Sequence, residues 1–177
     1  EVIASEALGT DVKINGDLSF TLLPQPQMVM SRVVVGPEGA PILEIDRVDA
    51  HLALMEFLRD YYEVQKLVLD TPSFHLKVAE DGGLDLPVTL AQNGGRDNVS
   101  IEDAHIINGS FLLSDLRSDE HWRVENIQGH LSATALRGPF AFTGSGVFNE
   151  KELALRLNTS DLNTRGDIRV SSFLSPP

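Results

Sequence analysis

The chain has 177 residues and a formal net charge of −12, from 14 Lys and Arg against 26 Asp and Glu. This balance argues against a nucleic-acid partner and against docking on an anionic bilayer through a basic patch, since both need an excess of Lys and Arg. The chain contains no cysteine, which rules out disulfides, thiolate metal sites and a cysteine nucleophile. No apolar run reaches the roughly 20 residues of a membrane helix.

The length and the 42% hydrophobic content fit one folded domain over residues 1–177. The chain opens at Glu1 without Met and stops at Pro177, just after a strand-like run. We therefore expect it to be a fragment of a longer protein, with any targeting segment outside it.

The first third of the chain reads as strands. Apolar and polar residues alternate over Asp11–Leu22, which predicts two half-buried strands or one strand bent near Gly16. Further strands are expected over Met28–Val35 and Ile42–Leu54. In the latter the apolar phase shifts at Asp46-Arg47, which indicates a β-bulge.

One short segment has helical periodicity. In Met55–Tyr62 the apolar residues recur at a spacing of three to four, whereas Glu56, Arg59 and Asp60 fall on the opposite side. We expect a short helix here, long enough to cover one end of a sheet.

The stretch Val64–Leu86 predicts a strand, a kink, a second strand and a turn at Asp81-Gly82. Pro72 lies at the kink. Proline has no amide hydrogen to donate and is confined to edges or bulges, so Pro72 should mark where a strand ends or bends.

The remainder of the chain also reads as strands separated by turns, after a loop over Pro87–Asn98. The later strands are expected at Val99–Ser114, Trp122–Ala135, Pro139–Phe148, Glu152–Asn158 and Asp167–Leu174.

Two pairs of segments resemble each other within the chain. Leu67–Leu76 matches Ala104–Leu113, apolar residue on apolar residue and Ser-Phe on Ser-Phe. Val48–Leu52 echoes Ile127–Leu131 around a His-Leu pair. Such self-similarity is typical of elongated arrays, although two short echoes do not establish a repeat.

Each predicted strand has one apolar face, and these faces need a cover. A second sheet, curling of the sheet on itself, or a non-protein molecule would all serve, and the pattern by itself does not choose among them.

The sequence contains no recognisable catalytic or metal-binding motif. None of the five histidines has the spacing of a metal-ligand pair, and Gly144-Ser145-Gly146 lies between strand-like residues with no helix to receive a phosphate. The carboxylates are scattered over the polar faces. We therefore expect no enzyme activity, no cofactor and no metal.

Short motifs resemble the AsmA family. Val12-Lys13-Ile14-Asn15-Gly16 runs into Pro24-Gln25-Pro26, like the V-x-I-x-G strand and P-x-P segment that open the family's domain. Val48–Leu58 followed by Val64–Leu76 resembles the family's next block. Later strands of the family are matched by Ile106–Asp115 and Leu131–Gly144, so the resemblance extends over nearly the whole chain.

The resemblance implies a mainly β fold: a curled, largely antiparallel sheet forming an open groove or half-barrel, as in AsmA and the related TamB and chorein-type lipid-bridge proteins. It also implies an inner-membrane anchor outside this fragment and a location on the periplasmic face of the inner membrane of a Gram-negative bacterium. The implied role is phospholipid transport toward the outer membrane and outer-membrane assembly, within cell-envelope biogenesis.

On that basis the expected ligands are phospholipid acyl chains, held by the apolar strand faces. The candidate groove residues are Val12, Ile14, Leu18, Phe20, Phe74, Leu76, Phe111, Leu113, Phe140 and Phe142. The alternative is that the same side chains form an ordinary dry core, in a structural or protein-binding β module whose exposed edge strands pair with other envelope proteins.

Overall fold

The computed structural model describes residues 10–54, 62–82, 99–135, 138–160 and 170–175. Within these residues every regular element is a strand. The ten strands are β1 (Val12–Ile14), β2 (Leu18–Thr21), β3 (Gln27–Val35), β4 (Leu43–Leu52), β5 (Tyr62–Val78), β6 (Val99–Asp115), β7 (Glu120–Ala133), β8 (Phe140–Phe148), β9 (Lys151–Thr159) and β10 (Val170–Ser175).

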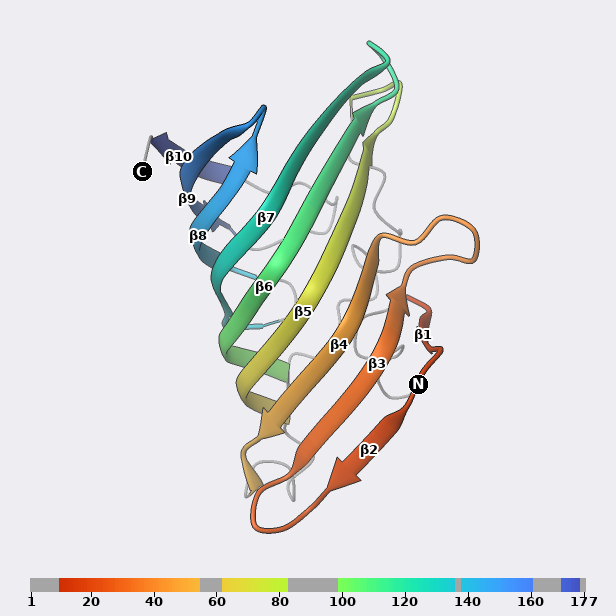
Figure 1. Cartoon of the computed structure of the whole chain (residues 1–177), viewed down its shortest axis with the longest axis vertical. Helices are drawn as coiled ribbons and strands as arrows, with labels where there is room; N and C mark the ends of the chain where they lie inside the picture. Colours follow the sequence, from red (N-terminus) through yellow and green to blue (C-terminus); the bar gives the residue numbers. More distant parts are fainter. Residues whose placement is uncertain (1–9, 55–61, 83–98, 136–137, 161–169, 176–177) are drawn as a thin grey trace.

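All ten strands belong to one open sheet in the order β1-β3-β4-β5-β6-β7-β8-β9-β10, with β2 beside β1 on the same edge of β3 (Figure 1). The predicted mainly β, largely antiparallel fold is confirmed. The exception is the central pair, because β5 and β6 run parallel. A parallel pair needs a crossover connection, which a reading of successive hairpins does not anticipate.

One local prediction lies almost entirely outside the described residues, and a second needs correction in part. The helix expected over Met55–Tyr62 falls on residues 55–61, outside the described residues, and Tyr62 is the first residue of β5, where it pairs with Val99. The kink at Pro72 does not end a strand. β5 continues through it, so Pro72 lies inside a central strand, opposite Ile45 of β4 and at a position that is skipped in the pairing with β6.

The stronger sequence echo is the register of the parallel pair. The residues that match between the two segments are neighbours across β5 and β6: Leu67 pairs with Ala104, Leu69 with Ile106, and Phe74 with Phe111. Residues directly opposite each other in a sheet point to the same face. The similarity therefore places like side chains side by side.

A line of irregular residues crosses the middle of the sheet. Four of them have a positive φ of 51° to 53°, and Asp46 is skipped in the pairing on both sides of β4. This bulge line comprises Arg32 in β3, Asp46 in β4, Thr71 in β5, Asn108 in β6 and Asn126 in β7. The phase shift predicted at Asp46-Arg47 is thus one member of a feature shared by neighbouring strands, although β4 has no extra residue there and keeps its register with β3 and β5.

The bulge line keeps one face apolar along the full length of the strands. Without it, the residues beyond the bulge would point to the wrong side, because side chains alternate with a period of two. With it, Ile45 and Val48 are both buried although three positions separate them, and Leu69 and Pro72 show the same spacing.

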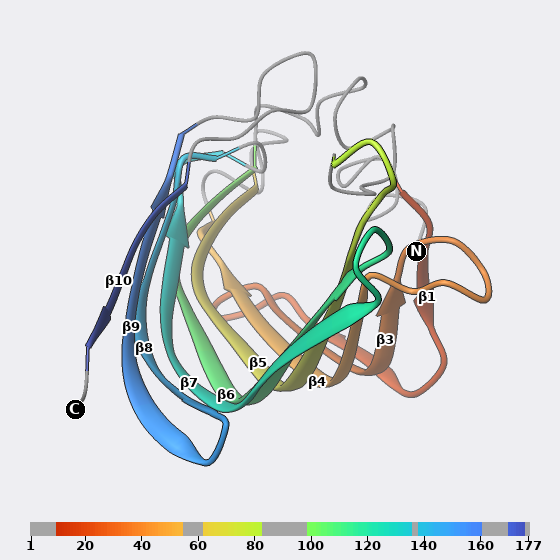
Figure 2. The same ribbon diagram turned by 90° about the horizontal axis from the view of Figure 1, so that it is seen from above.

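The sheet is curved into a trough, with β5 and β6 at its floor and β1–β4 and β7–β10 in its two walls (Figure 2). The accessible surface is 10587 Å², against about 8,500 Å² expected for a compact monomer of this length. The excess follows from the single-layer architecture, because in the described part of the chain no second sheet covers the first.

Two glycines face each other where β7 meets β8. Gly129 pairs with Gly144, and the ring of Phe142 lies against both positions. A Cβ on Gly129 would lie 2.6 Å from the Thr143 carbonyl oxygen, and one on Gly144 would collide with the Gln128 carbonyl oxygen. Gly144-Ser145-Gly146 is therefore part of a close strand pairing, the alternative to a phosphate loop.

This contact gives a stability test. Gly144→Val should destabilise the protein by about 3 kcal/mol, at the upper end of overpacking costs, because the obstacle is backbone on β7 that no rotamer change can move. Chemical denaturation would measure the loss. Ser145→Ala, one residue along β8 with its side chain on the other face, serves as the control and should change stability by less than about 0.5 kcal/mol.

Candidate functional site

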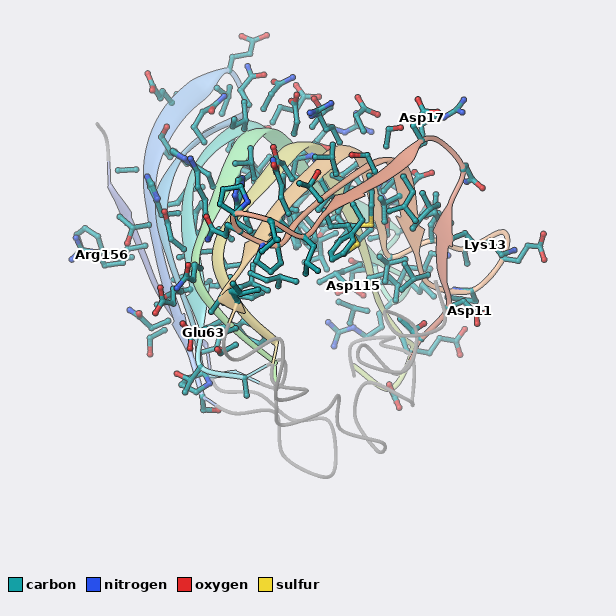
Figure 3. All side chains as sticks on the ribbon, turned by 90° about the horizontal axis from the view of Figure 1, so that it is seen from below. Asp11, Lys13, Asp17, Glu63, Asp115 and Arg156 are labelled. Atoms are coloured by element: carbon teal, nitrogen blue, oxygen red, sulfur yellow. The ribbon has the colours of Figure 1, made fainter. Side chains whose placement is uncertain are left out.

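The concave face of the trough is the apolar face. Lys13 and Arg156 point away from the trough, whereas Asp115 lies inside it (Figure 3). Because neighbouring residues in a strand alternate between faces, Val12 and Ile14 beside Lys13 must point inward, as must Leu155 and Leu157 beside Arg156.

Cross-strand pairing extends this assignment to the whole sheet. One row of directly opposed, inward-pointing residues runs from β2 to β9: Phe20, Met28, Ala50, Leu67, Ala104, Leu131, Phe142 and Leu157. A second row lies beyond the bulge line: Val12, Val35, Leu43, Phe74, Phe111 and Val124. The strands thus line one side of the sheet with almost uninterrupted hydrocarbon.

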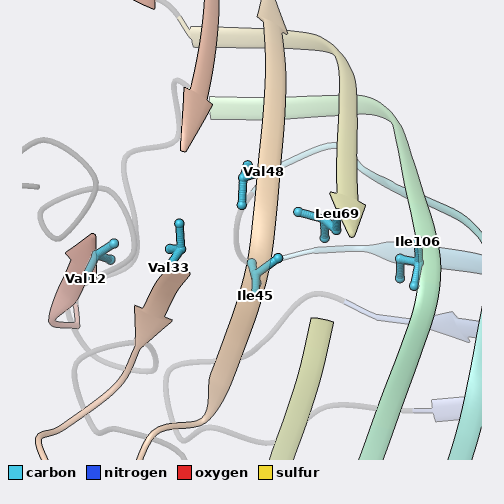
Figure 4. Close-up of a cluster of buried hydrophobic side chains, with 6 residues drawn as sticks. All are labelled: Val12, Val33, Ile45, Val48, Leu69 and Ile106. Atoms are coloured by element: carbon cyan, nitrogen blue, oxygen red, sulfur yellow. The ribbon is translucent and has the colours of Figure 1, made fainter. Parts of the chain in front are cut away.

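Part of this face is a packed stripe. Six side chains from β1, β3, β4, β5 and β6 are at most 7% exposed and form one cluster (Figure 4). The members are Val12, Val33, Ile45, Val48, Leu69 and Ile106. Side chains from β7 and β8 also pack against this cluster, among them Leu131 and Phe142, so the curvature of the sheet contributes to the burial.

All ten candidate groove residues lie on the concave face, but their environments differ. Val12 belongs to the packed stripe, and Ile14 and Phe142 pack against it. Leu18 and Phe20 on the edge strand β2 are 56% and 51% exposed. The others are half-buried: Phe74, Leu76, Phe111, Leu113 and Phe140.

Phe74 and Phe111 lie at the centre of the half-buried group. They are directly paired across the parallel strands β5 and β6, and Leu76 and Leu113 form the next pair on the same face. Two large aromatic rings with part of their surface accessible would be an unusual core, because core aromatics are normally covered.

Trp122 was not among the candidates, although it belongs with them. It pairs with Leu113, points to the concave face and is 36% exposed. The alternation of Trp122 and Val124 with polar neighbours was the available signal. Only the pairing of β7 with β6 shows that this alternation continues the row of Leu76 and Leu113.

A hollow of about 590 Å³ lies at one end of the sheet, where β6 and β8 begin and β7 and β9 end. Glu102 is the one charged residue that lines it, and the remaining lining is apolar or carries hydroxyl and amide groups. The other lining residues are Ser100, Ile101, Ser132, Ala133, Thr134, Pro139, Phe140, Ala141, Asn158 and Thr159.

The convex face carries the polar side chains. The Ser110 hydroxyl donates to Ser73 Oγ over 3.0 Å, and Ser73 Oγ lies 2.8 Å from His75 Nε2. His130 Nδ1 lies 2.8 Å from Asp103 Oδ1. Among the described residues no group of three His, Cys, Asp or Glu side chains is placed to hold a metal ion.

At the opposite end of the sheet from the hollow, a buried carboxylate terminates the floor of the trough. Asp115 ends β6 and accepts three hydrogen bonds from Arg117: Nη2 at 2.7 Å, Nε at 3.0 Å and the backbone N–H at 2.9 Å. These hydrogen bonds lower the pKa of Asp115 to about 2. The ion pair closes the turn between β6 and β7.

The family model for the AsmA family matches residues 1–173, nearly the whole chain. Searches with this chain found no match among the curated proteins and none among the solved structures. Among the described residues there is no helix with the length and apolarity to cross a membrane.

The Asp115–Arg117 pair predicts a pH dependence of stability. The folded-state pKa of about 2 lies below the unfolded value of about 3.9. The contribution of the ionised Asp115 to the free energy of unfolding is therefore complete above about pH 4 and is lost as the pH falls toward 2. Asp115→Asn should lower the melting temperature at pH 7. The difference in melting temperature between this variant and wild type should become steadily smaller below pH 4.

Asp119→Asn is the matched control for this measurement, because it removes the same charge from the same turn. Asp119→Asn should leave the melting temperature nearly unchanged at pH 7 and below pH 4. If the difference in melting temperature between Asp115→Asn and wild type stays constant from pH 7 to pH 2, ionised Asp115 is not the source of the stabilisation.

Proposed function

The chain belongs to the AsmA family, whose members are generally associated with the envelope of Gram-negative bacteria, and from this premise we propose that its concave face holds the acyl chains of phospholipids. The observation that carries the proposal is the continuous apolar face of an open sheet, most of whose large side chains remain partly accessible.

The chemistry of the concave face suits hydrocarbon. Each CH₂ group moved from water onto such a surface contributes about 0.8 kcal/mol, so an acyl chain needs no charged contact to be held. The opposed pairs Phe74–Phe111 and Leu76–Leu113 offer broad side chains on the floor of the trough. The acidic net charge of −12 does not oppose this mode, because tails rather than headgroups make the contact.

The packed stripe and the half-buried residues would have different roles in this mechanism. The six clustered side chains fix the curvature, and the half-buried residues on either side of them present the surface that a lipid covers. The hollow beside Phe140, with its hydroxyl and amide groups, would accommodate the more polar part of a lipid at the end of the strands.

In the cell we propose a non-catalytic role for this chain, on the periplasmic face of the inner membrane and held there by an anchor outside residues 1–177. It would contribute to phospholipid transport to the outer membrane and to outer-membrane assembly. In the described part of the sheet β10 is the last strand at one edge, which leaves room for pairing with other envelope proteins or with further strands of the same protein.

The direct test is native mass spectrometry of the protein purified from bacterial cells, followed by lipid extraction. Phe111→Asp should reduce co-purified phospholipid by at least about tenfold, because a charge on the floor of the trough opposes burial under an acyl chain. Ile107→Asp is the matched control: Ile107 also lies in β6 and is 39% exposed, but it points to the convex face. It should retain lipid.

Circular dichroism of both variants separates lipid loss from unfolding. If Phe111→Asp unfolds, Phe74→Asp on the neighbouring strand repeats the test. Wild-type protein that is folded and free of lipid would contradict the proposal, as would unfolding of both phenylalanine variants, which would assign the concave face to a dry core.

A further inference from the structure

Exposed large apolar side chains gather at one corner of the sheet. Leu18 and Phe20 in β2 are followed by Leu22 and Leu23 in the turn to β3, and their exposed fractions are 56%, 51%, 43% and 68%. Monomeric proteins rarely leave such a concentration uncovered, and where it occurs it marks a binding surface. We call residues 18–26 the apolar tip; it projects from the lower end of the sheet in Figure 1.

The apolar tip lacks charge. From Leu18 to Ser31 the sequence contains no Asp, Glu, Lys or Arg, although 23% of the whole chain is charged. A surface for a protein partner normally has a polar, charged rim that sets orientation. A surface that enters a bilayer avoids charge, because moving a charged group out of water is costly.

The turn is held firmly while its leucines stay exposed. Pro26 is fully buried, and its carbonyl oxygen accepts a hydrogen bond of 2.9 Å from the Leu52 N–H. The Gln25 side chain donates to Gln65 Oε1 over 3.0 Å. Gln25 and Pro26 thus fix the second half of the turn to β4 and β5, while Leu22 and Leu23 in the first half remain exposed to solvent.

The apolar tip is continuous with the concave face. Phe20 pairs with Met28 and Leu18 with Met30. These methionines pair in turn with Ala50 of the first concave row and with Val48 of the packed stripe. Hydrocarbon surface thus extends without a polar interruption from the exposed turn to the interior of the trough.

We propose that the apolar tip inserts into the surface of a phospholipid bilayer. Leu22 and Leu23 would enter the boundary between headgroups and acyl chains, and Leu18 and Phe20 would connect that boundary with the concave face. Because apolar contact drives the insertion, it should occur with zwitterionic as well as anionic vesicles and should persist in 0.5 M salt, where surface charges are screened within about 4 Å. The insertion does not require an occupied trough.

Vesicle flotation of the 177-residue chain tests this insertion, with vesicles of phosphatidylethanolamine and phosphatidylglycerol or of phosphatidylcholine alone. Leu22→Ser/Leu23→Ser should weaken flotation by at least about tenfold, since the side chains lost are those buried in the bilayer. Phe173→Ser is the control: Phe173 is 65% exposed on the edge strand β10, far along the sheet. It should float like wild type.

A fluorescence measurement reports which part of the protein enters the bilayer, whereas flotation reports only how strongly the protein binds. Because the chain has no cysteine, an environment-sensitive dye can be placed at Thr21→Cys beside the turn, or at Lys151→Cys in β9. Vesicles should shift the emission of the first to the blue and leave the second unchanged.

The outcomes separate this inference from the proposed lipid holding. Phe111→Asp should lose co-purified lipid yet still float, and Leu22→Ser/Leu23→Ser should show the reverse. Equal flotation of the serine variant and wild type would overturn the inference, as would equal losses in the serine variant and Phe173→Ser. So would a wild-type dimer that the serine variant abolishes without any vesicle binding, since the tip would then join two copies of the chain.

Discussion

The structure depends on backbone pairing within a single layer. In the described part of the chain each strand is held edge to edge by its neighbours, and no second sheet lies against the apolar face. A flat sheet of this kind would leave that face in water, at a cost that grows with its area. Among the described residues, the curvature brings side chains from both walls of the trough together, and the packed stripe lies where they meet.

The bulge line makes the curvature and the apolar face compatible. Irregular residues at matching positions in neighbouring strands, from Arg32 to Asn126, shift the side-chain phase together. The register of β3, β4, β5 and β6 stays constant across this line, whereas the register between β6 and β7 shifts there. A bulge in one strand alone would turn its apolar residues outward beyond that point. Pro72 fits the same line because a skipped pairing position spares it the amide hydrogen that a central strand would otherwise require.

The division of charge and hydrocarbon connects the fold with the proposed role. Carboxylates and histidines occupy the convex face and the turns, whereas the concave face and the apolar tip are hydrocarbon. Asp115 lies inside the trough at the end of β6, and three hydrogen bonds from Arg117 keep it ionised there. An acidic protein with this distribution would meet lipids through their tails, which is consistent with the envelope association of the AsmA family.

The sequence by itself determined the strands, the face to which each side chain points and the family, because period-two alternation and short motifs are local properties. It also determined the phase shift at Asp46, since the change in apolar spacing between Ile45 and Val48 is a property of neighbouring residues. Only the tertiary structure decided that β5 and β6 run parallel, that Trp122 continues the row of Leu113, and that Val12 is packed while Phe74 stays partly open. Those features depend on register between distant segments and on the curvature of the whole sheet, which no window of the sequence contains.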